Sequence, residues 1–400
     1  FTLNYDKNFG DNNVSAMVVG NGFQQTKDGE YHNTTNANLG FNVNYNFAHR
    51  YYVDATASIV HSAKLAEGHR NEVSPSLTLG WNLAKESFLD GSIFDDLLLS
   101  ASVSQLSEDI DVAFITYPNG QPQTNRYYLY NGNWDKNQWG YQWGDGKSAT
   151  TIAPSRGENE NLEMIKRKEF SANLKFSMLD HFFTGDVTFF KNKMTGYIVN
   201  TTEDWPDHMQ RFIPYLNNDE NGRQGFDFAF NVNDQFNDDL FMSLGLVGTY
   251  YDTEVLKKEQ STLDKENQSQ LDKEGRPIDA IWGYKCLGMF QTAEEVDFAN
   301  SGLPKQTGTV RPGDLRYADL SNNGVGDSII NADDKVFLGK DGRFGSPFVF
   351  GVNFTVKYKS FTLFVAGKAE WGALASIMNT QYQPNTYYQP KSNDRYSEIV

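Results

Sequence analysis

Apolar and polar residues alternate along most of this 400-residue chain, a pattern typical of strands whose two faces meet different surroundings. The clearest case is residues 38–47, where Leu39, Phe41 and Val43 alternate with asparagines and a glycine. After a short turn at 48–50 the alternation resumes, which predicts a hairpin. The same reasoning predicts about twelve strands, at residues 1–7, 14–25, 38–47, 51–59, 73–83, 97–103, 170–178, 183–189, 226–232, 240–250, 348–358 and 361–365.

The connections between these predicted strands alternate in length. Short connections cover residues 8–13, 48–50, 84–96, 179–181, 233–239 and 359–360. Long connections cover residues 26–35, 61–72, 105–166, 192–222 and 252–346. Short turns at one end and long loops at the other are typical of a transmembrane β-barrel of the outer-membrane type. Such a sheet closes on itself and turns apolar side chains outward, because lipid satisfies no backbone hydrogen bond.

The alternative is a soluble β-sandwich, in which the apolar faces pack on a core instead of lipid. Two features favour the barrel. The polar face is built from Asn, Ser, Thr, Asp and Lys in almost every strand, and loops hold close to half of the chain, far more than connections of the usual four to six residues. Aromatic residues near strand ends predict interfacial girdles; they are Tyr45, Phe47, Tyr51, Trp81, Tyr250 and Tyr358.

Composition narrows the class of protein further. The net charge is −16, which argues against nucleic acid as a partner. The mean hydropathy is −0.58, and the chain has no apolar run of the roughly 18 to 20 residues that a spanning helix needs. It contains 29 Phe, 21 Tyr and 7 Trp, too many rings for a disordered acidic chain. The single cysteine, Cys286, excludes an internal disulfide framework.

Several segments, in consistent order, resemble one family. Residues 281–291, followed by Glu294 and Glu295, resemble a conserved segment of the SusC/RagA-type TonB-linked outer-membrane transporters of Bacteroidota. Residues 312–319, 333–339 and 347–353 resemble the run that leads into a late barrel strand of that family. Further similarity lies at residues 71–89, 170–198 and 224–230.

The resemblance implies an all-β fold, a 22-stranded barrel with its lumen filled by a plug. It also implies a SusD-like surface lipoprotein as partner, energy from TonB-ExbB-ExbD, and dimers of SusC-SusD pairs. We expect residues 1–400 to form about twelve strands of the barrel, without the plug, the TonB box or the N-terminal extension. Residues 105–166 and 252–346 are the expected large extracellular loops, and the short turns are expected to be periplasmic.

The loop at 105–166 concentrates aromatic residues beside amides and acids. Flat rings of this kind stack on sugar faces or anchor a protein interface, and a loop of this length also needs rings for its own packing. Substrate contact, lipoprotein contact and self-packing therefore stay open. The candidate binding residues are Tyr127, Tyr128, Tyr130, Trp134, Trp139, Tyr141 and Trp143.

The acidic segment that starts at Asp319 begins like a calcium loop, with oxygen ligands at alternate positions and a glycine at the sixth. The twelfth position is Ile330, where a bidentate acid belongs. The alternative is a turn held by bonds between Asx side chains and the backbone. If the intervening residues loop out, a structural Ca²⁺ would have as ligands Asp319, Ser321, Asn323, Asn331 and Asp334.

No catalytic constellation is evident. The six histidines are scattered, and the chain has no His-Glu-x-x-His motif, phosphate-binding glycine loop or Gly-x-Ser-x-Gly elbow. We therefore expect a non-enzymatic protein that needs no cofactor: the barrel of an outer-membrane importer for a glycan or a peptide. The alternatives are a scaffold barrel that transports nothing and a soluble or surface carbohydrate-binding β-protein.

Overall fold

The computed structural model describes residues 1–25, 34–109, 129–144, 146–200, 205–260, 271–302, 304–306, 308–321, 326–341 and 346–374. The chain divides into two compact units. The first comprises residues 1–259 with 350–369, and the second comprises residues 260–349 with 370–400. Each unit is described by itself below.

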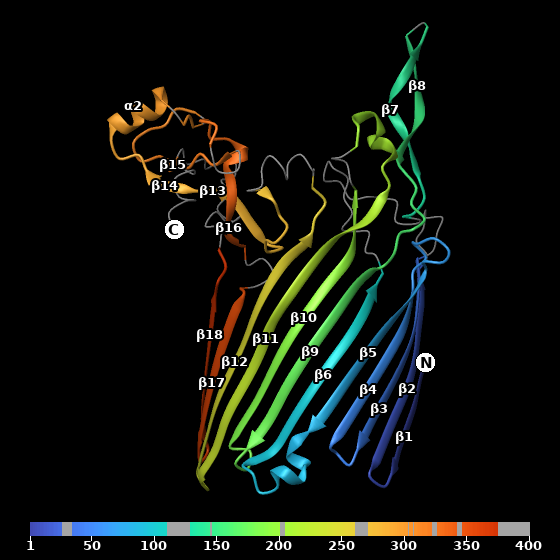
Figure 1. Ribbon diagram of the computed structural model, residues 1–400, viewed down its shortest axis with the longest axis vertical. Coiled ribbons are helices and arrows are strands. Elements are labelled where there is room, and N and C mark those ends of the chain that lie inside the picture. The colour runs from blue at the N-terminus through green and yellow to red at the C-terminus, as the bar shows by residue number, and fades with distance from the viewer. Residues whose placement is uncertain are drawn as a thin grey trace. The chain divides into compact units, whose positions relative to one another are not determined.

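The first unit is built on one sheet of twelve strands (Figure 1). Their bounds are β1 Thr2–Phe9, β2 Asn12–Gln25, β3 Thr34–Phe47, β4 Tyr51–His61, β5 Asn71–Asn82, β6 Phe94–Glu108, β9 Ile165–Met178, β10 Phe183–Asn200, β11 Tyr215–Asn237, β12 Leu240–Lys257, β17 Phe348–Tyr358 and β18 Phe361–Trp371. Sheet order follows chain order from β1 to β18, and the registers between neighbours are antiparallel. All twelve predicted strands are present, so the predicted all-β barrel class is confirmed.

Several strands are longer than predicted. The connection expected at 192–222 is mostly strand, because β10 continues to Asn200 and β11 begins at Tyr215. The two strands stay paired through this stretch, with an irregularity near Tyr197. Apolar residues such as Ile198 and Tyr215 are mixed with polar residues here without a two-residue repeat, so no alternation marks the strands in the sequence. The strands persist here because each neighbour supplies the backbone hydrogen bonds of the ladder.

Two of the other four long connections, residues 105–166 and 252–346, contain structure of their own. Residues 105–166 include the hairpin of β7 (Asn133–Trp143) and β8 (Lys147–Arg156).

Short 3-10 turns lie in two further connections, at Leu83–Lys85 and Ser87–Leu89 between β5 and β6 and at Asp207–Phe212 between β10 and β11.

In the described part of the second unit there are two small sheets and one α-helix. Strand β13 (Ala280–Tyr284) pairs with β16 (Lys335–Lys340), and β14 (Cys286–Met289) pairs with β15 (Leu315–Tyr317). Helix α2 (Ala293–Ser301) begins at Thr292, whose side chain accepts a hydrogen bond from the Glu295 amide. Phe290, Val296 and Val310 form a small core. A 3-10 turn at Ala332–Asp334 precedes β16.

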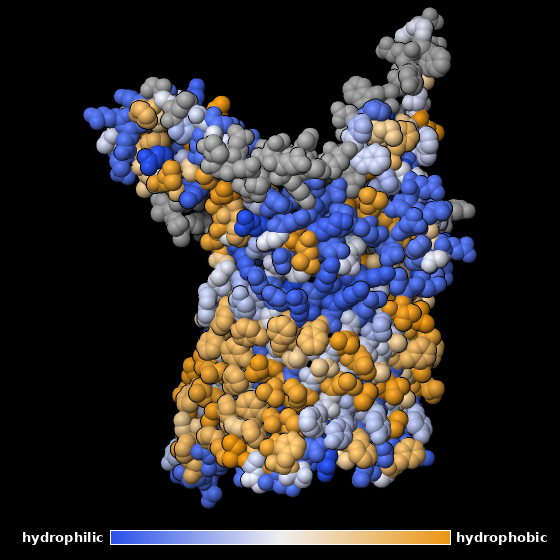
Figure 2. All heavy atoms as spheres, viewed as in Figure 1, coloured by the Kyte–Doolittle hydropathy of each residue, from blue (hydrophilic) through white to orange (hydrophobic). Residues whose placement is uncertain are grey.

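The apolar face of the large sheet stays exposed. Leu79 and Val103 are each 52% exposed, and Phe170 is 45% exposed. Figure 2 shows apolar side chains gathered over the part of the sheet nearer the short turns, and hydrophilic side chains over the part nearer the long connections. A soluble sandwich would cover this face with a second sheet, whereas a membrane protein leaves it to lipid. We call this side of the sheet the outer face.

The opposite, inner face is polar and hydrogen-bonded. The Asn42 amide donates to Asp54 Oδ1 at 3.3 Å and to Thr56 Oγ1 at 2.8 Å. The amide of Asn173 donates to Asp186 Oδ1 at 2.6 Å and to Thr188 Oγ1 at 2.7 Å. Cross-strand networks of this kind satisfy the asparagines that alternate with the apolar residues in the sequence.

The outer face ends at the short turns in aromatic residues with polar partners. Tyr51 and Trp81 are cross-strand neighbours. Their O–H and N–H groups donate to the same oxygen, Glu86 Oε1, at 2.7 and 3.1 Å. These hydrogen bonds, from Tyr51 first and Trp81 second, lower the pKa of Glu86. Rings that pair an apolar body with a bonded polar tip are typical of a membrane interface. At these two residues the structure agrees with the predicted girdle.

Among the described residues, no helix is both long and apolar enough to cross a membrane.

Candidate functional site

The candidate binding region lies in the connection between β6 and β9. Of its predicted residues, Tyr127 and Tyr128 lie outside the described part of the chain. The backbone of Trp139, Tyr141 and Trp143 lies in β7, but their side chains lie outside what the structure describes. The remaining two, Tyr130 and Trp134, have described positions: Tyr130 is half-buried and Trp134 is 63% exposed.

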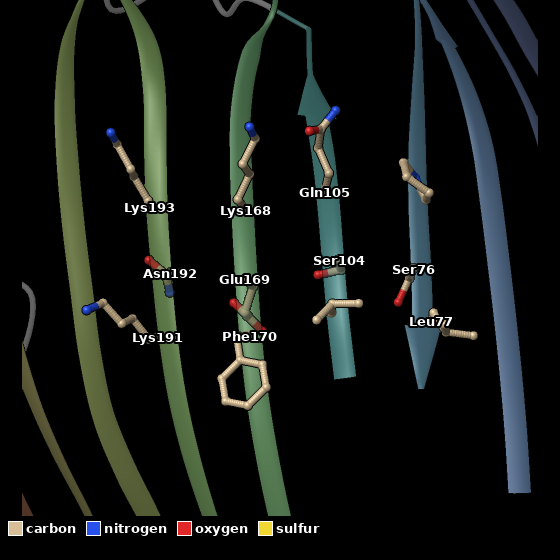
Figure 3. A pocket seen from close by; sticks show the side chains of 12 residues that line it. Ser76, Leu77, Ser104, Gln105, Lys168, Glu169, Phe170, Lys191, Asn192 and Lys193 are labelled. Carbon is tan, nitrogen blue, oxygen red and sulfur yellow. The ribbon is translucent and has the colours of Figure 1, made fainter. Parts of the chain in front are cut away.

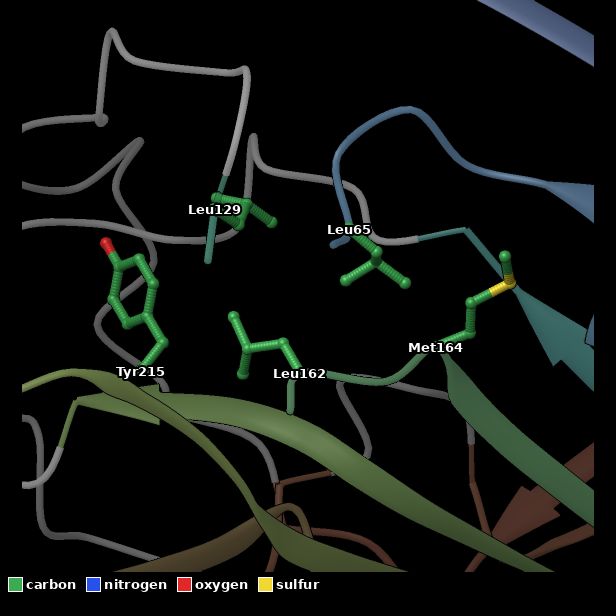
Figure 4. Packing of buried hydrophobic residues seen from close by; sticks show 5 residues of the cluster. All are labelled: Leu65, Leu129, Leu162, Met164 and Tyr215. Carbon is green, nitrogen blue, oxygen red and sulfur yellow. The ribbon is translucent and has the colours of Figure 1, made fainter. Parts of the chain in front are cut away.

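A buried cluster ties this connection to its neighbours. It joins one residue between β4 and β5, three between β6 and β9, and one at the start of β11. Figure 4 shows the three leucine side chains directed into a common space, with Tyr215 and Met164 on either side of it. They are Leu65, Leu129, Leu162, Met164 and Tyr215, and none is more than 1% exposed. Tyr130 packs against this cluster, so at this residue the rings serve the packing of the connection itself.

Hydrogen bonds hold the base of the β7–β8 hairpin. Arg156, at the end of β8, is only 6% exposed. Its guanidinium lies 4.7 Å from the centre of the Tyr215 ring and donates to the carbonyl of Asn131 at 3.0 and 3.3 Å. The Asn159 side chain donates to the carbonyl of Tyr215 at 2.7 Å. A buried cation needs such partners to offset its desolvation, so Arg156 fixes the hairpin on the sheet.

The hairpin carries an exposed apolar face. Trp134 is the cross-strand partner of Pro154, and Ile152 is the partner of Lys136. Since cross-strand partners and every second residue share a face, Trp134, Ile152 and Pro154 lie on the same side. Ile152 is 69% exposed. Exposed aromatic and aliphatic side chains on a rigid ribbon are typical of interface anchors.

The inner face of the sheet forms a second candidate surface. A cavity of about 590 Å³ near the short turns is lined by polar and charged groups together with apolar residues such as Leu98 and Phe176. Lys175, Asp186 and Asn231 line it, together with Asn82 and His181. The surface offers both donors and acceptors, which suits hydrated ligands or polar protein segments.

The predicted calcium ligands form an Asx network in the second unit. Asp334 is fully buried, and its two oxygens accept three amide hydrogens, from Leu320 at 2.7 Å, Ser321 at 3.0 Å and Asn331 at 2.7 Å. Asp319 accepts from the amides of residues 327 and 328 at 3.0 and 2.7 Å.

Asn331 caps the 3-10 turn through its side chain, and Asn323 lies outside the described residues. Among the described residues, no group of three or more His, Cys, Asp and Glu is arranged to hold a metal ion. Each carboxylate oxygen can accept a further bond or ligate an ion besides the amide bonds described above. Calcium binding by these residues therefore stays a prediction.

Two residues of the candidate site, Ile152 and Arg156, were not predicted from the sequence. Ile152 and Arg156 lie in a segment with small and polar neighbours, and neither belongs to an obvious motif. Ile152 could be found only by recognising β7 and β8 as a hairpin, since its exposure depends on that register. Arg156 could be found only from its contact with Tyr215, which is distant in the sequence.

Solved structures place this fold among outer-membrane β-barrel transporters. The RagAB peptide transporter aligns over 93% of this chain and 40% of its own, with a TM-score of 0.64 and 14% identity. The RagAB peptide importer in its "open-open" state aligns over the same shares, with a TM-score of 0.67 and 14% identity. At this identity the likeness concerns the fold.

The chain is also similar in sequence to a TonB-dependent receptor. TonB-dependent receptor P3 of Formosa agariphila is 24% identical over 380 residues, which are 89% of this chain and 34% of the receptor. No family model matches the chain. The predicted resemblance is therefore confirmed as similarity of sequence to a TonB-dependent receptor and as similarity of fold to the RagAB transporter. The chain spans about a third of the curated relative.

Proposed function

We propose that this chain is part of the barrel of a TonB-dependent importer in a bacterial outer membrane, which takes up a glycan or a peptide. The observation that carries the proposal is the twelve-stranded sheet with an exposed apolar face and a hydrogen-bonded polar face. The similarity to TonB-dependent receptor P3 and the fold of the RagAB peptide transporter support it. The chain contributes binding surfaces and no covalent chemistry.

In this proposal the apolar outer face meets lipid, and the polar inner face lines the lumen. The short turns lie in the periplasm, and the long connections lie at the cell surface. The aromatic pair Tyr51 and Trp81 lies at the turn end of the apolar band, which fits a membrane boundary there. Energy arrives through TonB-ExbB-ExbD, acting on a plug in the lumen.

The surface partner is a SusD-like lipoprotein that docks on the long connections. The exposed face formed by Trp134, Ile152 and Pro154 supports contact with a protein. Its hairpin is anchored at the base by Arg156, so little conformational freedom is lost there on docking. Two such pairs could assemble into a dimer.

Copurification from the native membrane tests the partner. A tagged full-length protein, extracted in mild detergent, should bring down a surface lipoprotein. The double variant Trp134→Ala/Ile152→Ser should weaken that association by at least tenfold, since each large anchor contributes about 1–2 kcal/mol. Ile93→Ser is the matched control, because Ile93 is 57% exposed at the opposite end of the strands. Equal lipoprotein yield from both variants would contradict docking on the hairpin.

Growth tests transport. Deletion of the gene, and separately of TonB, should abolish growth on the same glycan or peptide mixture. A strain that grows normally without the protein on every mixture that requires TonB would favour the scaffold alternative.

A further inference from the structure

Three lysines gather on the outer face, immediately beyond the apolar band. Strand β9 carries Lys168, and the neighbouring β10 carries Lys191 and Lys193. In register, Lys193 lies opposite Lys168, and Lys191 lies opposite Phe170. Cross-strand partners share a face, so all three lysines lie on the side of the exposed Phe170. Figure 3 shows the ammonium groups of Lys168 and Lys193 directed toward the end of the strands that carries the long connections.

The pairing of Lys168 with Lys193 is unfavourable by itself. Directly opposed side chains have Cβ atoms about 5 Å apart, and like charges at that distance destabilise a sheet. The other directly opposed residues offer no acid: Gln105 lies opposite Lys168, Gln224 opposite Lys191 and Gly222 opposite Lys193. A sheet face that is merely solvated usually interleaves both signs of charge.

Local acids neutralise only part of this cluster. Lys193 forms an ion pair with Glu220 at 2.6 Å. The nearby Lys166 also forms ion pairs, with Glu72 at 3.2 Å and with Glu163 at 2.8 Å. Among the described residues, Lys168 and Lys191 have neither an ion-pair nor a hydrogen-bond partner, and both side chains are exposed. Two cations therefore remain for a ligand.

The cluster borders an open groove with an apolar floor. The groove has a volume of about 510 Å³, and its lining includes all three lysines together with Leu77, Val103 and Phe170. These three apolar side chains are 41%, 52% and 45% exposed. A ligand seated here would meet cations at one end and apolar side chains at the other.

The depth of the cluster matches the headgroup layer of a membrane. Lys168 lies two positions before Phe170 in β9, and Lys191 lies two positions after Phe189 in the antiparallel β10, so each lies beyond an outward aromatic residue on the side of the long connections. Two residues advance a strand by about 7 Å, or roughly 5 Å along the membrane normal at the tilt of a barrel strand. The headgroup layer is itself about 5–7 Å thick on each side.

We propose that Lys168 and Lys191, beside the ion-paired Lys193, bind the phosphate of an anionic lipid in the leaflet on the side of the long connections, with its acyl chains along Leu77, Val103 and Phe170. The lipid phosphate relieves the repulsion between Lys168 and Lys193 and holds the barrel at a fixed depth. This assignment requires the membrane location in the proposed function and adds a ligand to it.

Native mass spectrometry of the full-length protein in detergent tests the site. The probe is lipid A that carries its phosphates, compared with dephosphorylated lipid A and with inorganic phosphate. A lysine near an anionic surface contributes about fivefold in affinity, so Lys168→Gln/Lys191→Gln should weaken binding about 25-fold. Lys168→Arg/Lys191→Arg should retain it. The matched control is Lys357→Gln/Lys359→Gln, which removes two lysines at the other end of the strands.

Two results would overturn the site: equal affinity of wild type and the glutamine variant, or binding that does not require the phosphate on the lipid. Binding of inorganic phosphate as tightly as of lipid A would also overturn it. The same samples are run with and without boiling on a gel. A protein that stays soluble without detergent and shows no mobility shift would refute the membrane location, independently of the lysines.

Discussion

Replacement of Leu174 by arginine probes the outer face at its deepest point. Leu174 lies in β9, four residues from Phe170 and four from Met178, which bound the apolar stretch of that strand. The distance to either end is about 13 Å along the strand, so Leu174 lies near the middle of the band. An arginine at the midplane of a barrel costs about 2–4 kcal/mol, and near the interface about 0–1 kcal/mol.

Leu174→Arg should therefore lower the free energy of unfolding by about 2–4 kcal/mol, whereas Phe170→Arg at the band edge should lower it by about 1 kcal/mol or less. The assay is urea unfolding of the full-length protein in lipid vesicles, followed by the gel shift between folded and unfolded forms. Lys175→Ala on the inner face is the face control, with an expected change within about 0.5 kcal/mol. Equal costs for Leu174→Arg and Phe170→Arg would refute the assignment of this face to lipid.

Three further changes test the turns and the connections. Hydrogen bonds from Tyr51 and Trp81 lower the pKa of Glu86, so the Glu86 carboxylate stabilises the fold above the ordinary glutamate pKa and this stabilisation is lost as pH falls through the lowered pKa. Trp81 fluorescence should therefore change as Glu86 is protonated in wild type, and should not change in Glu86→Gln. Gly157→Ala would place a Cβ 1.9 Å from the carbonyl oxygen of Phe212, so hydrogen exchange should rise at both residues while the sheet stays protected, and unchanged exchange would contradict that contact. Asp334→Ala leaves three amides without their acceptor, at about 1–3 kcal/mol each, and limited proteolysis should cut residues 305–341 faster than in Asp334→Asn.

The strands that cross the apolar band were readable from the sequence because each carries a two-residue repeat. Residues 39–47 are the clearest example, and their register with 51–61 is regular. The repeat fades where β10 and β11 leave the band, near Asn192 and Gly222. Beyond that point the strands pack against the long connections, as at Ile198 and Tyr215, so the side chains no longer follow a two-residue repeat.

The candidate site was only partly readable. An excess of aromatic residues at 105–166 singled out the region, and of its candidate binding residues Trp134 is exposed, so its role as an interface anchor stays a prediction. Tyr130 instead packs against the buried cluster. That cluster joins Leu65 to Tyr215 across 150 positions of sequence. Contacts of that separation depend on the sheet register, which no local pattern encodes.

The central claim is that alternate residues of one strand face lipid and water. Site-directed spin labels at residues 170 to 177 of β9 test it in the full-length protein in vesicles, after Cys286→Ser removes the single thiol of residues 1–400 and any cysteine elsewhere in the full-length chain is also replaced by serine. Oxygen partitions into lipid and a nickel chelate into water. The account predicts high oxygen accessibility at Phe170, Ala172, Leu174 and Phe176, and low oxygen accessibility at the residues between them. Accessibility without a two-residue period, or with the opposite phase, would contradict it.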